Sequence, residues 1–213
     1  MKTSEFTRII TAVVILAIVI GFKETMQGNP AFLAQALFFS MLIIGISILS
    51  KKWMASLFEM DVEHRLWTMS RWGWLKQNHL QSPLPTGIVF PLIASLFTKG
   101  TLKLMTLLTY ETTARKTRAA RSFGNYRYVT TTDWHNGLIG AAGVVGVLLL
   151  ALMSYFFTQQ SEVLVKMAIY YAFVSIIPFS DLDGSQIFFG SRILWGTLAT
   201  VTTIFFLYAL LLR

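Results

Sequence analysis

Long apolar runs separated by polar and often basic segments dominate the pattern along the chain. Four runs have the length of about 20 residues that a helix needs to cross a bilayer; they cover residues 6–22, 31–50, 137–157 and 193–212. A fifth run, residues 163–177, is shorter and ends at Pro178, which cannot continue a helix. The pattern predicts an all-α, multi-pass membrane protein with about five transmembrane helices in one membrane domain over 1–213.

Two further segments are apolar or aromatic without being clear crossings. Residues 84–110 are interrupted by prolines, glycines and lysines. Because non-helical backbone at membrane depth must be covered by protein, we expect a re-entrant hydrophobic hairpin, or one short helix followed by a strand. Residues 53–75 mix tryptophans with charged residues, which predicts an interfacial amphipathic helix.

Composition supports the membrane interpretation and sets an orientation. The 213 residues are 54% apolar and 13% charged and include no cysteine, which excludes a soluble domain, a disulfide-stapled secreted domain and a zinc-finger array. Lys and Arg outnumber Asp and Glu by 18 to 10, and in a membrane protein this excess marks cytoplasmic loops rather than nucleic-acid binding. The basic residues gather in 51–83 and 111–134. We therefore expect a cell-membrane protein with a cytoplasmic N-terminus, a retained anchor helix at 6–22 and anionic lipid at the basic segments.

Two carboxylates stand on a bend between apolar runs. Asp181 and Asp183 lie between Pro178 and Gly184, and ionisable residues at the membrane are functional hypotheses by default. A carboxylate held there can coordinate a metal. Alternatively, both carboxylates cap the final helix near its N-terminus, where the helix dipole favours negative charge.

The stretch from Ser175 to Gly184 resembles a signature of the site-2 proteases, a family of intramembrane zinc metalloproteases. That signature is Asn-x-x-Pro-x-x-x-Leu-Asp-Gly, and the chain matches it at Pro178, Leu182, Asp183 and Gly184, with Ser175 in the Asn place. The resemblance implies a site-2 protease-like core over residues 31–192. It also implies that Asp183 corresponds to the family's third zinc ligand.

The other family signature, His-Glu-x-x-His, is absent from the chain. Its counterpart, judged by its place at the cytoplasmic end of a helix before a basic and aromatic stretch, puts Ser47 and Lys51 at the two His positions and Ile48 at the Glu position. A catalytic zinc takes three protein ligands and a water, and its general base must accept a proton. The resemblance therefore implies a degenerate member that is proteolytically impaired and holds no cofactor.

Lys51 suggests a replacement for the metal, because its ammonium can neutralise a buried Asp183. An equally good alternative has Lys51 reaching the headgroups while Asp183 faces water. The family's Gly-Pro-x-x-Asn element also has a degenerate counterpart, with valines in place of its Pro and Asn. The glycines remain at every third position, which predicts close helix packing at Gly140, Gly143 and Gly146.

Three functions stay open at this point. We expect an impaired relative that binds or sequesters a transmembrane helix or partner protein in the groove where family members bind substrate. The first alternative is an active metalloendopeptidase with reorganised zinc ligands, in which Asp133 and His135 meet Asp181 or Asp183. The second is a small transporter or lipid-handling protein, against which the chain has no two-fold internal repeat.

Overall fold

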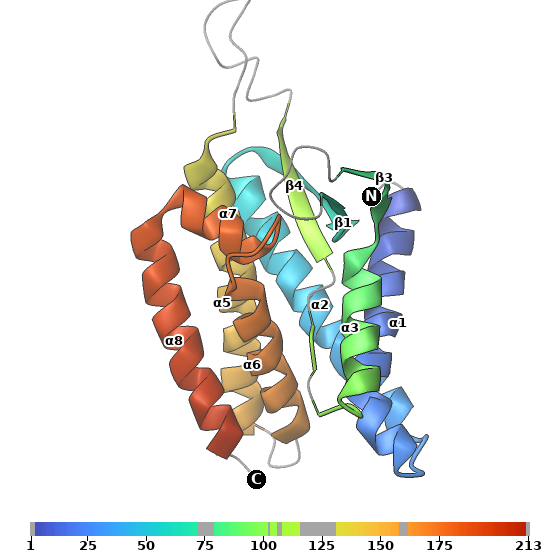
Figure 1. The fold of residues 1–213 in the computed structure, drawn as a ribbon. Coiled ribbons are helices and arrows are strands. Elements are labelled where there is room, and N and C mark those ends of the chain that lie inside the picture. Colours follow the sequence, from blue (N-terminus) through green and yellow to red (C-terminus); the bar gives the residue numbers. More distant parts are fainter. Residues whose placement is uncertain are drawn as a thin grey trace, which may run out of the picture. The chain divides into compact units, whose positions relative to one another are not determined.

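The computed structural model describes residues 3–71, 79–101, 103–105, 108–115, 131–157 and 162–211, and Figure 1 shows their elements. Most of the described residues are helical. The helices are α1 (Thr3–Met26), α2 (Phe32–Leu57), α3 (Thr86–Phe97), α5 (Asp133–Phe157), α6 (Glu162–Ile176), α7 (Asp183–Gly190) and α8 (Arg192–Leu211). The strands are β1 (Met60–Leu66), β2 (Met69–Arg71), β3 (His79–Leu84) and β4 (Leu108–Ala114).

The helices confirm the four long apolar runs. α1, α2, α5 and α8 are each long and apolar enough to cross a membrane. The fifth run also forms a helix, but α6 has 15 residues, which is short of the roughly 20 that a straight crossing needs. The chain is therefore a membrane protein, and the part of it that the structure describes contains four candidate spanning helices. The side on which its N-terminus lies stays a prediction.

Residues 84–110 form a short helix followed by a strand, the second of the two arrangements expected for this region. α3 contains Pro91, and the chain turns at Gly100 with a φ of 75°. Residues 103–105 have no regular secondary structure, and β4 begins at Leu108. The turn is close to α1, because a Cβ on Gly100 would lie 2.9 Å from the backbone nitrogen of Lys23.

The prediction of an amphipathic helix over residues 53–75 is wrong for residues 58–71, whereas residues 72–75 lie outside the described residues. α2 ends at Leu57, and β1 and β2 follow it. Along β1 the side chains of Met60, Val62 and His64 are buried and alternate with more exposed neighbours, which is the period of a strand with one covered face. β1 pairs with β4, and β2 pairs antiparallel with β3. The all-α assignment therefore misses two small sheets in a mostly helical protein.

The chain forms two compact units. The first comprises Met1–Met41 and Arg65–Thr109, and α1 packs against α3 within it. The second comprises Leu42–His64 and Tyr110–Arg213. In the second unit α5 packs on α6 and α7, and α6 packs on α8; Figure 1 shows α7 across one end of α5, α6 and α8.

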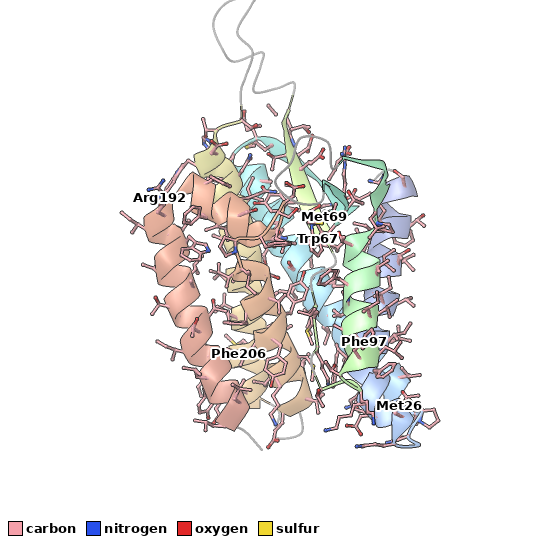
Figure 2. The ribbon with its side chains drawn as sticks, viewed as in Figure 1. Met26, Trp67, Met69, Phe97, Arg192 and Phe206 are labelled. Atoms are coloured by element: carbon pink, nitrogen blue, oxygen red, sulfur yellow. The ribbon has the colours of Figure 1, made fainter. Side chains whose placement is uncertain are left out.

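Aromatic stacking helps to join α6 to α8. The rings of Phe173 and Phe206 are stacked with centroids 4.1 Å apart and planes 12° apart, and Figure 2 marks Phe206 on α8. Much of the rest of α8 is uncovered, with exposed apolar side chains such as Ile204 and Leu211. An uncovered apolar helix face is what a lipid-facing helix presents.

Candidate site at a buried lysine and aspartate

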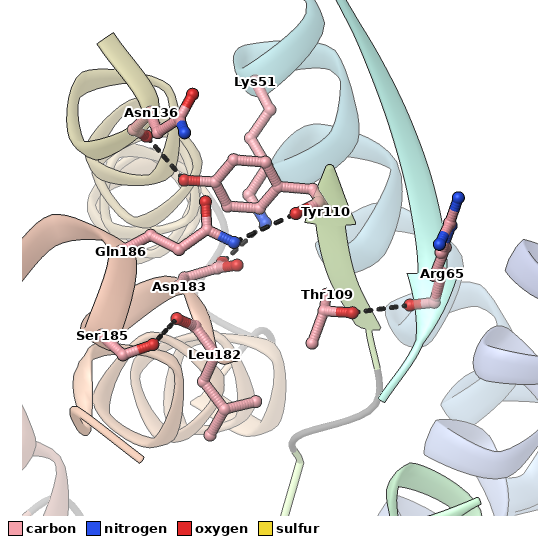
Figure 3. A network of polar contacts seen from close by, with 9 residues as sticks. All are labelled: Lys51, Arg65, Thr109, Tyr110, Asn136, Leu182, Asp183, Ser185 and Gln186. Atoms are coloured by element: carbon pink, nitrogen blue, oxygen red, sulfur yellow. Dashed lines mark hydrogen bonds and ion pairs between the residues drawn. The ribbon is translucent and has the colours of Figure 1, made fainter. Parts of the chain in front are cut away.

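A lysine and an aspartate meet inside the second unit (Figure 3). The Lys51 Nζ atom donates a hydrogen bond to the Asp183 Oδ2 atom over 2.6 Å, and the two side chains are 2% and 5% exposed. The ion pair predicted between these residues is therefore confirmed. The alternative, in which Lys51 reaches the headgroups and Asp183 faces water, is wrong.

A tight turn between α6 and α7 places the carboxylate. A Cβ on Gly184 would overlap the carbonyl oxygen of Ile176, so only glycine allows the turn to lie against the end of α6. Ser180 adopts a φ of 53° in this turn, and the Ser185 hydroxyl lies 2.6 Å from its carbonyl oxygen. Trp195 of α8 donates a hydrogen bond to the Ile176 carbonyl oxygen over 2.9 Å. The close approach of Gly184 to α6 and the hydrogen bonds of Ser185 and Trp195 therefore fix the corner at which α7 begins.

This turn also corrects the expected cap. Asp183 is the first residue of α7, a helix that the sequence did not predict, and α8 begins nine residues later at Arg192. Asp183 is buried, whereas Asp181 is exposed. The two carboxylates therefore do not share a role, and Asp183 does not cap α8.

The glycine face of α5 makes room for the lysine. A Cβ on Gly143 would overlap the Cε atom of Lys51, and a Cβ on Gly146 would overlap the Ser50 hydroxyl. A Cβ on Gly140 would lie 2.6 Å from the Tyr110 hydroxyl. The prediction of close packing along these glycines is confirmed, and its consequence is specific. α5 leaves the space that the Lys51 stem fills.

Tyr110, which sequence reasoning missed, closes the site from β4. The Lys51 Nζ atom lies 4.8 Å from the centroid of its ring, within the range of a cation–π interaction. Its hydroxyl donates to the Asn136 carbonyl oxygen over 2.6 Å, and Gln186 Nε2 donates to the Tyr110 carbonyl oxygen over 3.0 Å. Burial raises the pKa of the Tyr110 hydroxyl, and the nearby Asp183 carboxylate raises that pKa further. Tyr110 therefore stays neutral and links β4 to α5 and α7.

A second tyrosine, Tyr171, contacts a serine of α2 and a serine at the end of α6. The Tyr171 side chain of α6 is hydrogen bonded to Ser47 and to Ser175. Ser47 and Ser175, which the resemblance would align with the first His and the Asn of the family signatures, are both buried. The structure thus brings the predicted residues of α2 and the Ser175–Gly184 stretch into one buried polar cluster. Their link through Tyr171 was not predicted.

The electrostatics of Asp183 are those of a carboxylate with one partner. Its Oδ1 atom is buried and has no hydrogen-bond partner among the described residues. Burial raises the pKa of the Asp183 carboxyl, and the Lys51 ammonium opposes part of that rise. The charged form of the buried Asp183 carboxyl therefore depends on the Lys51 ammonium.

The residues at this site do not fit zinc. Ser47, Ile48 and Lys51 offer a hydroxyl, an alkyl group and an ammonium, whereas zinc sites in proteins use imidazole, thiolate and carboxylate. His135, proposed as a reorganised ligand, instead contacts the Thr132 hydroxyl through Nδ1 and packs edge-on against a phenylalanine ring. Among the residues that the structure describes, no three His, Asp or Glu side chains gather to hold a metal.

The comparisons with known proteins add no assignment. No family model, no curated protein and no solved structure matches the chain. Several basic residues for which lipid contact was expected lie outside the described residues, so that expectation stays a prediction for Lys76, Lys116, Arg118, Arg121 and Arg127.

Proposed function

We propose that the chain is a site-2 protease-like membrane protein that binds a transmembrane partner without cleaving it. In this proposal the Lys51 ammonium takes the place of the metal. The observation that carries it is the 2.6 Å contact between Lys51 Nζ and Asp183 Oδ2, with both side chains buried. A fixed cation beside the carboxylate repels a divalent ion. It also occupies Asp183, the one aligned residue with a side chain that zinc uses as a ligand.

Hydrolysis also lacks its proton acceptor. A zinc protease needs a carboxylate or another base beside the metal-bound water, and the residue that the proposed alignment puts at that position is Ile48. The neighbouring hydroxyl of Ser47 is hydrogen bonded to Tyr171. The site therefore has neither the metal donors nor the base of a metalloprotease, which favours the impaired relative over the active alternative.

The partner-binding part of the proposal rests on an exposed face of α2. Leu49, Trp53 and Leu57 follow one another at a spacing of four residues and are 67%, 66% and 60% exposed. Gly45 precedes them on the same face, and nothing lies within 4 Å of the Cβ it lacks. A small residue in line with large apolar ones lets a second helix approach closely.

The first test measures zinc content and cleavage together. The purified protein and its Asp183→Ala variant are assayed for bound zinc and for cleavage of a synthetic transmembrane substrate. We expect neither protein to hold stoichiometric zinc or to cleave. Cleavage by the parent that is lost in Asp183→Ala would overturn the proposal.

A reconstruction variant provides the positive control. Ser47→His, Ile48→Glu and Lys51→His together restore the family's metal-binding pattern on α2, where the side chain of residue 51 points at Asp183. We expect this triple variant to bind about one zinc. Adding Asp183→Ala should lower its zinc affinity, because loss of one ligand weakens the site. Zinc binding that is insensitive to Asp183→Ala would contradict the alignment of the two motifs.

The second test measures helix binding. A synthetic Leu-Ala helix of about 20 residues is added to nanodiscs that hold the labelled protein, and energy transfer reports association. We expect Gly45→Leu to weaken association because it blocks close approach. Gly196→Leu is the matched control, since the Cβ of Gly196 also meets nothing within 4 Å but lies on α8. Equal association of both variants with the parent would count against binding at α2.

A further inference from the structure

Two tyrosine hydroxyls meet where α5 and α8 end. The hydroxyl oxygens of Tyr155 and Tyr208 lie 2.9 Å apart and share a hydrogen bond, although the two residues are 53 positions apart in the chain. Their ring centroids are 6.1 Å apart, and the ring planes make an angle of 77°. Both residues belong to the second compact unit. The contact therefore joins two helices that otherwise pack mainly against α6 and α7.

The two phenol side chains are open to the surroundings of the protein. Tyr155 is 48% exposed and Tyr208 is 45% exposed. Each residue lies in the last turn of its helix, and both helices are candidate membrane spans. Tyrosines at the ends of spanning helices lie at the level of the lipid headgroups. Lipid can therefore reach both hydroxyls.

This exposure separates the pair from the tyrosines of the ion-pair site. Tyr110 and Tyr171 are 1% and 5% exposed, and their hydroxyls are hydrogen bonded to groups inside the protein. The hydroxyls of Tyr155 and Tyr208 are instead bonded to each other. A phenol hydroxyl both donates and accepts a hydrogen bond, so either oxygen still accepts from its neighbour after it has lost its own hydrogen.

The chemistry that fits such a pair is one-electron oxidation by a radical. A phenol gives up its hydroxyl hydrogen atom to a peroxyl radical, because the unpaired electron that remains is delocalised over the ring. Two phenoxyl radicals couple through the ring carbons beside the oxygen-bearing carbon. Because the two hydroxyls are already in contact, these carbons need only a rotation of two exposed side chains to meet, which takes picoseconds to nanoseconds.

We infer that Tyr155 and Tyr208 form a trap for lipid peroxyl radicals and become joined by a carbon–carbon bond. Each phenol O–H bond breaks and gives its hydrogen atom to one peroxyl radical, which is thereby reduced to a lipid hydroperoxide. The two phenoxyl radicals form a bond between one ortho carbon of each ring, and the hydrogen on each of these carbons moves to the oxygen of the same ring. Two phenols and two peroxyl radicals thus give one dityrosine and two hydroperoxides.

The new bond ties α8 to α5. It closes a loop that contains all of α6 and α7, and a covalent link of this kind stabilises a protein mainly by constraining its unfolded chain. α8 also supplies Trp195, whose indole donates a hydrogen bond to the end of α6. The trap therefore ends two radical chains in the membrane and fastens the helix that supports the corner beside Asp183.

The test oxidises the purified protein in lipid vesicles with a small amount of a lipid-soluble azo initiator. Vesicles of polyunsaturated phosphatidylcholine sustain a chain of lipid peroxyl radicals, whereas vesicles of saturated phosphatidylcholine do not. Dityrosine fluorescence measures the yield, and mass spectrometry of the digested protein identifies the two joined peptides. We expect one cross-link, between Tyr155 and Tyr208 of the same chain, with a yield several-fold higher in the polyunsaturated lipid.

The variants are Tyr155→Phe and Tyr208→Phe, with Tyr170→Phe as the matched control. The Tyr170 ring also contacts α8, 5.3 Å from the ring of Phe206, but Phe206 has no hydroxyl. We expect either pair variant to lower the yield to background and the control to keep the yield of the parent. After oxidation, the parent and the control should unfold at higher dodecyl sulfate than the two pair variants, and unfolding before oxidation shows that each variant is folded.

The outcomes that would overturn the inference differ in what they change. A cross-link at another tyrosine, or between two copies of the chain, would overturn the pairing of Tyr155 with Tyr208. Equal loss of yield in Tyr170→Phe would do the same. Equal yields in the two lipids would overturn the assignment to lipid peroxyl radicals. The position of the cross-link is read from the parent protein, so it decides the pairing even where a variant does not fold.

Discussion

The buried ion pair makes a strong prediction about stability. At 2.6 Å and an effective dielectric constant of about 20, the gross attraction between Lys51 and Asp183 is about 6 kcal/mol, and desolvation of the two groups offsets much of it. Removing one partner leaves the other buried and unpaired, which costs about 3–5 kcal/mol. Lys51→Met and Asp183→Asn should each lower the free energy of unfolding by that amount.

The double variant should be far less destabilised than the sum of the single ones. It leaves no buried charge and only one amide without its former partner, at a cost of about 1–3 kcal/mol. The coupling energy between the two positions, the sum of the two single costs minus the cost of the double variant, should therefore be about 6 kcal/mol. The free energy of unfolding of the parent, the two single variants and the double variant is measured in mixed micelles with increasing dodecyl sulfate, followed by tryptophan fluorescence.

A surface pair provides the control for this cycle. Arg115 Nε and Asp61 Oδ1 lie 2.7 Å apart, nearly the same distance, but their side chains are 45% and 57% exposed. The same cycle there should give a coupling energy below about 1 kcal/mol. Additive effects at Lys51 and Asp183, or equal coupling at the two pairs, would refute the argument that burial makes the inner pair strong.

Three further changes test the surroundings of the pair. Because the pKa of Asp183 is raised, stability falls as pH rises from the unfolded value of about 4 through the raised pKa of the folded state. Lys51→Met removes the ammonium that opposes the rise and should extend this fall to higher pH, which unfolding over a pH series would measure. Gly143→Ala places a Cβ against the Lys51 stem and should lower the free energy of unfolding by about 1–3 kcal/mol. The control Gly45→Ala should leave stability unchanged or raise it by up to about 1 kcal/mol. Equal unfolding midpoints for the two variants would contradict the close packing of Gly143 on Lys51. Trp195→Phe removes the hydrogen bond to the end of α6 and should cost about 1 kcal/mol in the same unfolding assay, and an unchanged midpoint would argue against that bond.

The spanning helices were predictable because their signal is local and long. Each depends on about 20 apolar residues, which no loop of this chain contains. The strand β1 carried an equally local signal, the alternation of Met60, Val62 and His64 with charged residues, but its tryptophan-rich surroundings favoured a helical interpretation. α7 was missed because its eight residues are too few for a helical period to be recognised.

The site was predictable only where a motif identified it. Lys51 and Asp183 are 132 residues apart, and the prediction that they pair came from the resemblance to the family signatures together with their location at the same predicted membrane face. Tyr110 and Tyr171 have no such position. Their roles depend on how β4 and α6 pack against the pair, and that packing leaves no trace in the spacing of residues.

The two partners of the ion pair differ in their freedom to separate. Asp183 is a short side chain on a turn whose backbone touches the end of α6 at Gly184, so the carboxylate cannot retreat unless that whole corner moves. Lys51 reaches it through four rotatable bonds from a single long helix. A rearrangement that opens the pair therefore begins with the Lys51 side chain on α2, while the corner between α6 and α7 keeps the carboxylate in place.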